Sequence, residues 1–240
     1  MLGVKLVTEP AREVDLLFTH FHMDHVFGFP FFAPIYTPGY QIRVFVPSFS
    51  EEEAMEKLGR YLNGVYHPTR LRELPAAVSW HPVRPGREYT LESGWRVTTA
   101  ALNHPGGAIA YRLEAGGRSV AYVTDTAPFA RPDEGVYAGN EPNSAEKRVL
   151  EFLAGCDTVV YDTMFDVDEY FEKMTWGHSY PEYAYALCKA AGVRHLVLFH
   201  HLPDATDDAL DALALHWQSA ADPVVTLARE GETIPVGRGA

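Results

Sequence analysis

The 240-residue sequence contains little cysteine and no long uninterrupted apolar segment. Its two cysteines, Cys156 and Cys188, are isolated, which excludes a disulfide framework and favours a reducing, cytoplasmic location. The longest apolar stretch, VFGFPFFAPIY at 26–36, is broken by Gly and Pro and is too short to span a bilayer. The first residues, MLGVKLVTEP, lack a basic segment followed by an apolar core, so we expect no export signal and no membrane partner.

Positive charge is scarce as well, because the net charge is −12 and no run of Lys or Arg occurs. Proteins that bind long nucleic acids neutralise several phosphates with such residues, so a nucleic-acid partner is not expected. The sequence shows no repeat, and its longest irregular segment, 126–143, is rich in turn-forming residues and predicts a surface loop. The length and the hydrophobic content of 47% indicate one globular domain over residues 1–240.

Short apolar segments that each run into a potential metal ligand recur along the chain. They are Val14–Phe18 before His20, Trp95–Leu102 before His104, Ser119–Val123 before Asp125, Thr158–Tyr161 before Asp162, and Leu196–Phe199 before His200. Such β-rich, nearly continuous apolar segments are typical of strands that are buried on both faces. The sequence therefore predicts sheets with ligand-type residues along one edge.

Helices are predicted between these strands from their N-terminal signals. Capping boxes begin the segments 50–62 (Ser50 with Glu53) and 179–192 (Ser179 with Glu182), and two further helices are expected at 144–155 and, after Thr206, at 206–217. Strands and helices together indicate the α/β (α+β) class, with layered sheets covered by helices.

The segment THFHMDH, 19–25, concentrates three histidines and an aspartate within six residues. In an extended segment, residues two apart project to the same side, so His20 and His22 can bind one cation together. A turn into a helix would direct Asp24 and His25 to a second cation. Burying these groups without a metal would be costly, and their chemistry suits Zn²⁺ first, with Mn²⁺ or Fe²⁺ also possible.

Further ligands are expected from the strand ends. The predicted arrangement puts His20, His22 and His104 on one ion, Asp24, His25 and His200 on the other, and Asp125 as a bridge. Two-metal hydrolytic sites hold their ions about 3.5–4 Å apart. His201 is an alternative to His200, although His200 directly follows the strand. Ordinary surface or core positions are expected for the other histidines, His67, His81, His195, His201 and His216.

These motifs resemble the metallo-β-lactamase superfamily from Val14 to about Asp211. The resemblance implies an αββα sandwich with a dinuclear site at the edge between its sheets, and His22 matches the hydrolases of the superfamily. Several strands normally precede the H-x-H-x-D-H motif in that superfamily. Only 19 residues precede His20 here, so the first sheet is expected to be short of strands.

The segments WGHS at 176–179 and LVLFHH at 196–201 are similar to the ribonuclease Z-like branch. That resemblance implies that His178 is not a metal ligand but protonates the departing oxygen when a phosphodiester is cut. Asp162 stands where the branch carries a glutamate that orients this histidine, and a local turn cap is the other interpretation of Asp162. The segments at 20–36 and 200–208 also look like bacterial metal-dependent hydrolases akin to cyclic-nucleotide and phosphonate-pathway phosphodiesterases.

The sequence thus predicts a phosphodiesterase with two divalent ions that acts on a small diester, with a cyclic nucleotide as the preferred substrate. Asp24 is expected to contact the attacking water as well as a metal, and the protein is expected to form a homodimer. The aromatic residues of 27–36 could stack on a base, line a dimer contact or pack in the core: Phe27, Phe29, Phe31, Phe32 and Tyr36.

Three alternatives come from other classes. A tRNA 3′-processing endonuclease is disfavoured because no long Gly/Pro- and Lys-rich arm is found and the net charge is −12. A lactonase or thioesterase of the same fold would have no obvious need for WGHS. A non-enzymatic metal-bound module is the weakest alternative, since the ligand set is intact.

Overall fold

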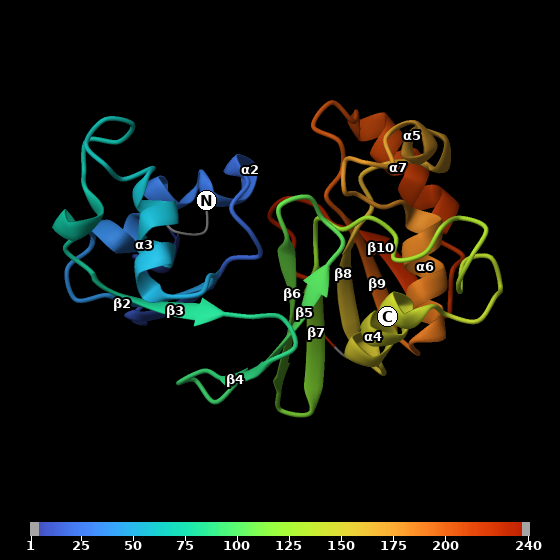
Figure 1. Ribbon diagram of the computed structural model, residues 1–240, viewed down its shortest axis with the longest axis horizontal. Helices are drawn as coiled ribbons and strands as arrows, with labels where there is room; N and C mark the ends of the chain where they lie inside the picture. Colours follow the sequence, from blue (N-terminus) through green and yellow to red (C-terminus); the bar gives the residue numbers. More distant parts are fainter. Residues whose placement is uncertain (1–4, 237–240) are drawn as a thin grey trace. The chain divides into compact units, whose positions relative to one another are not determined.

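The computed structural model describes residues 5–236 of the chain. Its contacts divide the chain into two compact units, unit 1 (Met1–Arg84) and unit 2 (Pro85–Ala240), shown with their elements in Figure 1. Each unit has its own β-sheet and its own hydrophobic core.

Unit 1 contains a parallel three-stranded sheet in the order β1-β2-β3. Its strands are β1 (Glu13–Leu17), β2 (Gln41–Pro47) and β3 (Ala77–Val83). The central strand β2 is buried at five consecutive positions, because both of its faces are covered and both of its edges are paired. One strand, β1, precedes His20 in the described part of the chain.

The helices of unit 1 are short. They are α2 (Met23–Val26), α3 (Glu51–Gly59) and the 3₁₀ turns η1 (Phe29–Phe31), η2 (Ala33–Tyr36) and η3 (Leu71–Glu73). Helix α3 packs against β3 and begins as predicted, with the Ser50 hydroxyl accepting a hydrogen bond from the Glu53 amide at 3.2 Å. Two side chains of this helix, Ala54 and Leu58, are completely buried in the core of unit 1.

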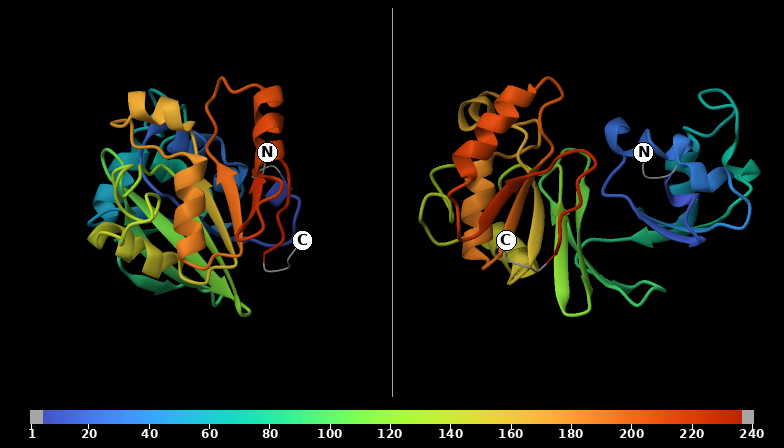
Figure 2. Two further views of the ribbon diagram at one scale, coloured as in Figure 1. Left: turned by 90° about the vertical axis from the view of Figure 1, so that its right-hand side faces the viewer. Right: turned by 180° about the vertical axis from the view of Figure 1, so that it is seen from behind.

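Unit 2 contains a seven-stranded sheet in the order β10-β9-β8-β7-β6-β5-β4. The strands are β4 (Glu88–Thr90), β5 (Arg96–Leu102), β6 (Ala108–Ala115), β7 (Arg118–Val123), β8 (Thr158–Asp162), β9 (His195–Phe199) and β10 (Val224–Leu227). The helices are α4 (Ser144–Leu153), α5 (Val167–Glu172), α6 (Pro181–Ala190) and α7 (Asp207–Trp217). Helices α4 and α6 cover one face of the sheet, as Figure 1 and the rear view in Figure 2 show.

The pairing of these strands explains where the polar residues at their ends lie. Strands β7, β8 and β9 run parallel as neighbours, while β5 and β7 are both antiparallel to β6. All four strands therefore point the same way, and their carboxyl ends meet at one edge of the sheet. His104, Asp125, Asp162 and His200 stand at this edge, which confirms the sequence-based expectation within unit 2.

All the strands and helices predicted from sequence are present, with ends shifted by up to three residues, and 126–143 contains no helix or strand. One capping prediction is wrong. The N-cap residue of α6 is Tyr180 and makes no side-chain cap, so Ser179 and Glu182 form no capping box there. Ser179 is completely buried, since the chain turns into the helix one residue later than the motif indicates.

No helix in residues 5–236 is both long and apolar enough to cross a membrane. Both cysteines are buried free thiols. The first four residues of the segment considered for an export signal lie outside the described part of the chain.

Candidate metal centre

In unit 1, the potential ligands lie at the point where β1 gives way to α2. The Phe18 amide still donates to the Phe45 carbonyl at 2.8 Å, which prolongs the strand up to the buried residues Thr19 and His20. His22 is the N-cap residue of α2, which carries Asp24 and His25. This short helix is anchored by Val26, which is completely buried in the core of unit 1.

All four potential ligands of unit 1 lie close together. The His20 ring is 4.6 Å from the His22 ring and 4.2 Å from the His25 ring, measured between centroids. The Asp24 carboxylate is 2.9 Å from Nε2 of His25. Donor atoms of His20 and His22 lie within 4.8 Å of each other, and so do those of Asp24 and His25. Two pairs of donors, as the i, i+2 spacing and the helical turn predicted, are therefore preformed in this unit.

In unit 2, Asp125 lies between two imidazoles. Nε2 of His104 is 3.8 Å from one carboxylate oxygen of Asp125, and Nε2 of His200 is 3.3 Å from the other. The side chains of His104 and Asp125 are each only 2% exposed. This carboxylate thus offers one oxygen toward each histidine, the arrangement that a bridging ligand requires. The potential donor groups of the described residues include His200 and not His201.

The backbone is strained at two of these residues. Asp125 (φ 59°) and His200 (φ 64°) adopt the left-handed conformation, and they are the only non-glycine residues with positive φ in the described part of the chain. This conformation costs roughly 1–2 kcal/mol for a residue with a side chain. Such strain persists where the surrounding structure enforces it, and it concentrates at functional sites.

The glycine of the WGHS motif holds His104 in place. Nδ1 of His104 donates a hydrogen bond of 2.9 Å to the Gly177 carbonyl, which leaves Nε2 as the nitrogen that faces Asp125. Gly177 has φ 90°, and a Cβ atom there would clash with Pro105 and lie 2.5 Å from Nδ1 of His104. Only glycine fits at this position.

Two threonines for which the sequence predicted no role form hydrogen bonds with other candidate metal ligands. The hydroxyl of Thr19 is hydrogen-bonded to Nδ1 of His20 at 3.0 Å, and the hydroxyl of Thr124 donates to Asp125 at 2.8 Å. Hydrogen bonds of this kind orient metal ligands. A sequence signal for them exists, since each threonine directly precedes a predicted ligand.

The completely buried Asp162 and the partly buried His178 form a hydrogen-bonded pair. Nδ1 of His178 donates to the Asp162 carboxylate at 2.8 Å, and that carboxylate also accepts from the Thr126 amide at 2.9 Å and the Met164 amide at 3.1 Å. The contact with Met164 is the local turn that one interpretation expected, and the contact with His178 is the one that the other expected. Asp162 makes both.

The His178 ring lies among the ligand candidates of unit 2. Its centroid is 5.3 Å from that of His104 and 5.0 Å from that of His200, to which it is nearly parallel at 15°. Asp162, His178 and His200 can also bring donor atoms within 4.8 Å of one another. The arrangement places an imidazole with a carboxylate partner directly beside two potential ligands.

Burial shifts the pKa of two titratable groups next to these residues in the direction that favours their neutral forms. Burial, assisted by the negative charge of Asp125, raises the pKa of Tyr122 to about 12. Burial also lowers the pKa of His201 below its ordinary value.

The donor chemistry fits divalent metal ions. Unit 1 offers three imidazoles and a carboxylate, and the edge of unit 2 offers two imidazoles and the Asp125 carboxylate. Nitrogen and oxygen donors of these types, without thiolate, suit Zn²⁺, Mn²⁺ and Fe²⁺.

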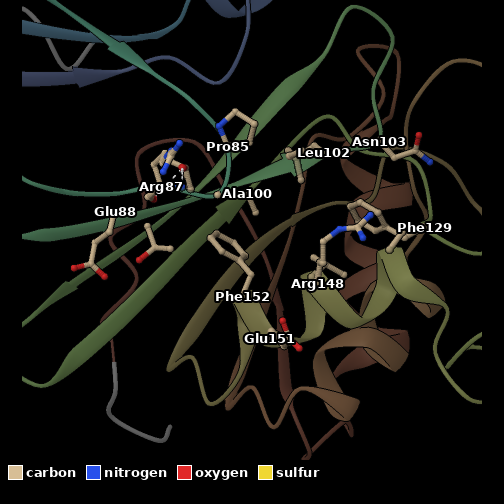
Figure 3. Close-up of a pocket in the computed structure, with 16 residues that line it drawn as sticks. Pro85, Arg87, Glu88, Ala100, Leu102, Asn103, Phe129, Arg148, Glu151 and Phe152 are labelled. Carbon is tan, nitrogen blue, oxygen red and sulfur yellow. Dashed lines mark hydrogen bonds between the residues drawn. The ribbon is translucent and has the colours of Figure 1, made fainter.

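A separate cavity of about 920 Å³ lies in unit 2 between β5 and α4 (Figure 3). Its walls include Ala100 and Leu102 of β5 and Arg148 and Phe152 of α4, and it extends to Asn103, the residue before His104. None of the candidate ligands lines it, so this cavity is distinct from the cluster of metal donors.

Comparison with known proteins places these observations in a family. The model for the beta-lactamase superfamily domain matches residues 4–201, which span both units. No curated protein matches the sequence.

Solved structures share the fold. Human tRNase Z, short form, has a TM-score of 0.64 at 17% identity, over 93% of this chain and 79% of that one. A diphosphatase from the PhnP family has a TM-score of 0.62 at 19% identity, over 97% and 76%. The metallo-β-lactamase fold protein YhfI from Bacillus subtilis has a TM-score of 0.61 at 17% identity, over 91% and 76%. The fold that the sequence motifs implied is confirmed.

Replacing Gly177 with alanine tests the support of His104. We expect Gly177→Ala to lower metal affinity by about 10- to 100-fold, the usual effect of losing such support, because the added methyl group displaces His104. Metal content after dialysis against graded chelator measures this. Gly192→Ala is the matched control, since Gly192 also has positive φ (66°) but open space around its Cβ position. Equal losses in both variants would contradict this role of Gly177.

Proposed function

Because this chain belongs to the β-lactamase superfamily, we propose that it is a metal-dependent phosphodiesterase that acts on a small substrate. The observation that carries the proposal is the His178–Asp162 pair beside His104 and His200. Hydrolysis at an activated ester carbonyl does not require such a proton donor, whereas expulsion of an alkoxide from phosphorus does.

We propose that the donors of both units serve the same two ions. In this assignment His20, His22 and His104 bind one ion, Asp24, His25 and His200 bind the other, and Asp125 contributes one oxygen to each. The family match, which runs through both units, supports a shared centre. We propose Zn²⁺ as the metal, which agrees with the donor types and with PqqB from Methylobacterium extorquens, a structural relative described as Zn²⁺-bound (TM-score 0.58, 16% identity).

Two divalent ions at these donors would lower the pKa of a shared water and offset negative charge on the phosphate oxygens. The residues of the chain orient the attacking water and the metal-binding groups. Asp24 is proposed to bind a metal ion, and one of its carboxylate oxygens can also accept a hydrogen bond from the attacking water. The Asp125 carboxylate, held by the Thr124 hydroxyl at 2.8 Å, keeps its two oxygens directed to different histidines.

His178 supplies the proton for the leaving group. Its Nδ1 proton is committed to Asp162 at 2.8 Å, so the exchangeable proton is carried on Nε2. As the new P–O bond forms and the bond to the leaving oxygen breaks, Nε2 donates this proton to the alkoxide, and solvent restores it afterwards. Asp162 compensates the positive charge of the protonated ring and fixes its orientation.

A small substrate fits the charge of the protein. With a net charge of −12, the chain has no basic surface segment to hold a polynucleotide, so a cyclic nucleotide is our preferred substrate. Two structural relatives, human tRNase Z and a diphosphatase from the PhnP family, have names that agree with cleavage at phosphorus but do not bear on the size of the substrate. The two free, buried cysteines support action in the cytoplasm.

Paired histidine substitutions test the sharing of two ions. Under our assignment, His22→Ala with His104→Ala removes one ion, whereas His104→Ala with His200→Ala removes both. If each unit bound an ion of its own, the first pair would remove both ions and the second pair only one. Metal analysis by mass spectrometry after gel filtration gives the counts, with the exposed His216→Ala as the control.

Loss of the proton donor should depend on the leaving group. We expect His178→Ala to lower kcat by about a hundredfold or more for a diester with an alkoxide leaving group. The loss should be much smaller for bis(p-nitrophenyl) phosphate, because p-nitrophenolate departs without a proton. Metal content should stay unchanged.

His195→Ala is the matched control for this experiment, since His195 is a half-buried histidine of unit 2 that is bonded to the Thr226 hydroxyl rather than to a carboxylate. Loss of metal in parallel with activity would show that His178 is a ligand, as its proximity to His200 permits. Equal losses for both leaving groups would likewise exclude it as the proton donor.

A substrate panel tests the reaction class. The wild-type protein should hydrolyse 2′,3′- or 3′,5′-cyclic nucleotides with a kcat/KM about a hundredfold or more above that for a chromogenic lactone, the factor that a proton donor contributes. A precursor tRNA with a 3′ extension belongs in the same panel. A preference for the lactone would show that the protein is a lactonase rather than a phosphodiesterase. Efficient cleavage of the tRNA would show that its substrate is a polynucleotide rather than a small diester.

A further inference from the structure

Two phenylalanines directly after the ligand helix point away from the core of unit 1. Phe27 is 53% exposed and Phe31 is 67% exposed, whereas Val26 and Phe29 are 0% and 4% exposed. The segment is therefore two-sided, with one side packed in the core and the other facing outward. Core packing explains Val26 and Phe29 but leaves Phe27 and Phe31 without a structural purpose.

These exposed rings begin a continuous series of aromatic side chains, which we call the aromatic row: Phe27, Phe31, His67 and Tyr36. Consecutive ring centroids are 6.1 Å apart for Phe27 and Phe31, 5.8 Å for Phe31 and His67, and 5.9 Å for His67 and Tyr36. The last two rings are nearly parallel, with an interplanar angle of 28°. Such distances are typical of aromatic rings that interact with one another.

The row is held by hydrogen bonds at its far end. The Tyr36 hydroxyl donates to the Pro30 carbonyl at 2.6 Å and lies 3.4 Å from Nε2 of His67. The loop that carries His67 is closed by the Gly64 amide, which donates to the His67 carbonyl at 2.9 Å. Tyr36 and His67 are thus positioned before any ligand binds, which lowers the entropic cost of binding.

The same loop carries two further exposed apolar side chains. The Asn63 side chain accepts hydrogen bonds from the amides of Val65 and Tyr66 at 2.8 and 3.0 Å, and both of those residues are 82% exposed. Exposed apolar side chains that lie next to one another, as Phe27 and Phe31 do, mark binding sites. The row itself carries no Lys, Arg, Asp or Glu, so its ligand is recognised by ring faces rather than by charge.

The position of the row in the chain indicates which part of a ligand it meets. Phe27 is the C-cap residue of α2 and follows Asp24 by three residues, and side chains three positions apart lie on the same face of a helix. A group that stacks on Phe27 therefore lies beside the Asp24 carboxylate, which is one of the donors proposed to bind a metal ion and, through it, a phosphate. A nucleotide has this combination, namely a phosphate and, a short distance from it, a flat heteroaromatic base.

We propose that the aromatic row binds the nucleobase of the substrate by stacking. This inference rests on the proposed phosphodiesterase function and narrows it to nucleotide diesters. Stacking accepts every base because each has a π face, so purine and pyrimidine nucleotides should both be bound. The other possible occupant is the same surface of a second copy of the chain, which the experiment distinguishes.

The test compares diesters with and without a base. Phe27→Ala and Phe31→Ala should each raise KM for adenosine and uridine 2′,3′-cyclic phosphates by about tenfold, the scale of one base–aromatic contact. Hydrolysis of glycerol 1,2-cyclic phosphate, which has no base, should stay unchanged. Phe49→Ala is the matched control, because Phe49 is also in unit 1 and is 75% exposed but does not belong to the row.

A binding measurement separates this inference from the proposed function. Calorimetric titration of the metal-loaded protein with a hydrolysis-resistant cyclic nucleotide phosphorothioate should show tight binding to the wild type and about tenfold weaker binding to the two variants. Such binding without turnover of any diester would contradict the proposed function but would still support the stacking site. Equal effects on glycerol cyclic phosphate, or no effect on either ligand, would overturn the stacking site. A wild-type dimer that dissociates in the variants, measured by light scattering, would also overturn it, because a second copy would then cover the row.

Discussion

The buried carboxylate of Asp162 is the contact on which the candidate site of unit 2 depends. It accepts hydrogen bonds from the Thr126 amide, the Met164 amide and Nδ1 of His178. The first bond holds the chain directly after Asp125, and the third orients His178. A completely buried carboxylate needs such donors, because leaving it unsatisfied would cost several kcal/mol. The requirement for hydrogen bonding therefore links the loop after Asp125 to His178.

The packing of the surrounding sheet and helices offsets the unfavourable backbone conformations at the candidate site of unit 2. Asp125 and His200 hold left-handed backbone conformations, and Gly177 approaches His104 so closely that no side chain is tolerated. These local costs are each on the order of 1–2 kcal/mol, which is a sizeable share of the net stability of a domain. The paired strands β7, β8 and β9, with α6 packed on β8 and β9, enforce these conformations.

The two units contribute different chemistry to the proposed reaction. Unit 1 offers the histidine-rich metal donors and, directly after them, the outward-facing rings of Phe27 and Phe31. Unit 2 offers the Asp125 carboxylate, proposed as the bridge, and His178, proposed as the proton donor. Under our proposals, the metal ions and the base-binding rings would hold the substrate, and His178 would determine that an alkoxide can leave from phosphorus. This division explains why the H-x-H-x-D-H motif alone is compatible with several reactions.

The sequence by itself determined the class of the fold, the strands that end at the site and the identity of the potential ligands. Apolar segments followed by His or Asp are local patterns, and so is the spacing of His20 and His22. Only the tertiary structure decided that Asp162 serves both His178 and the loop after Asp125, and that Gly177 supports His104 across 73 positions of sequence. It also decided that Phe29 is buried while Phe31 is exposed, although both lie in one apolar run. Contacts between distant residues and the direction of a ring depend on how strands and turns pack, which no local pattern specifies.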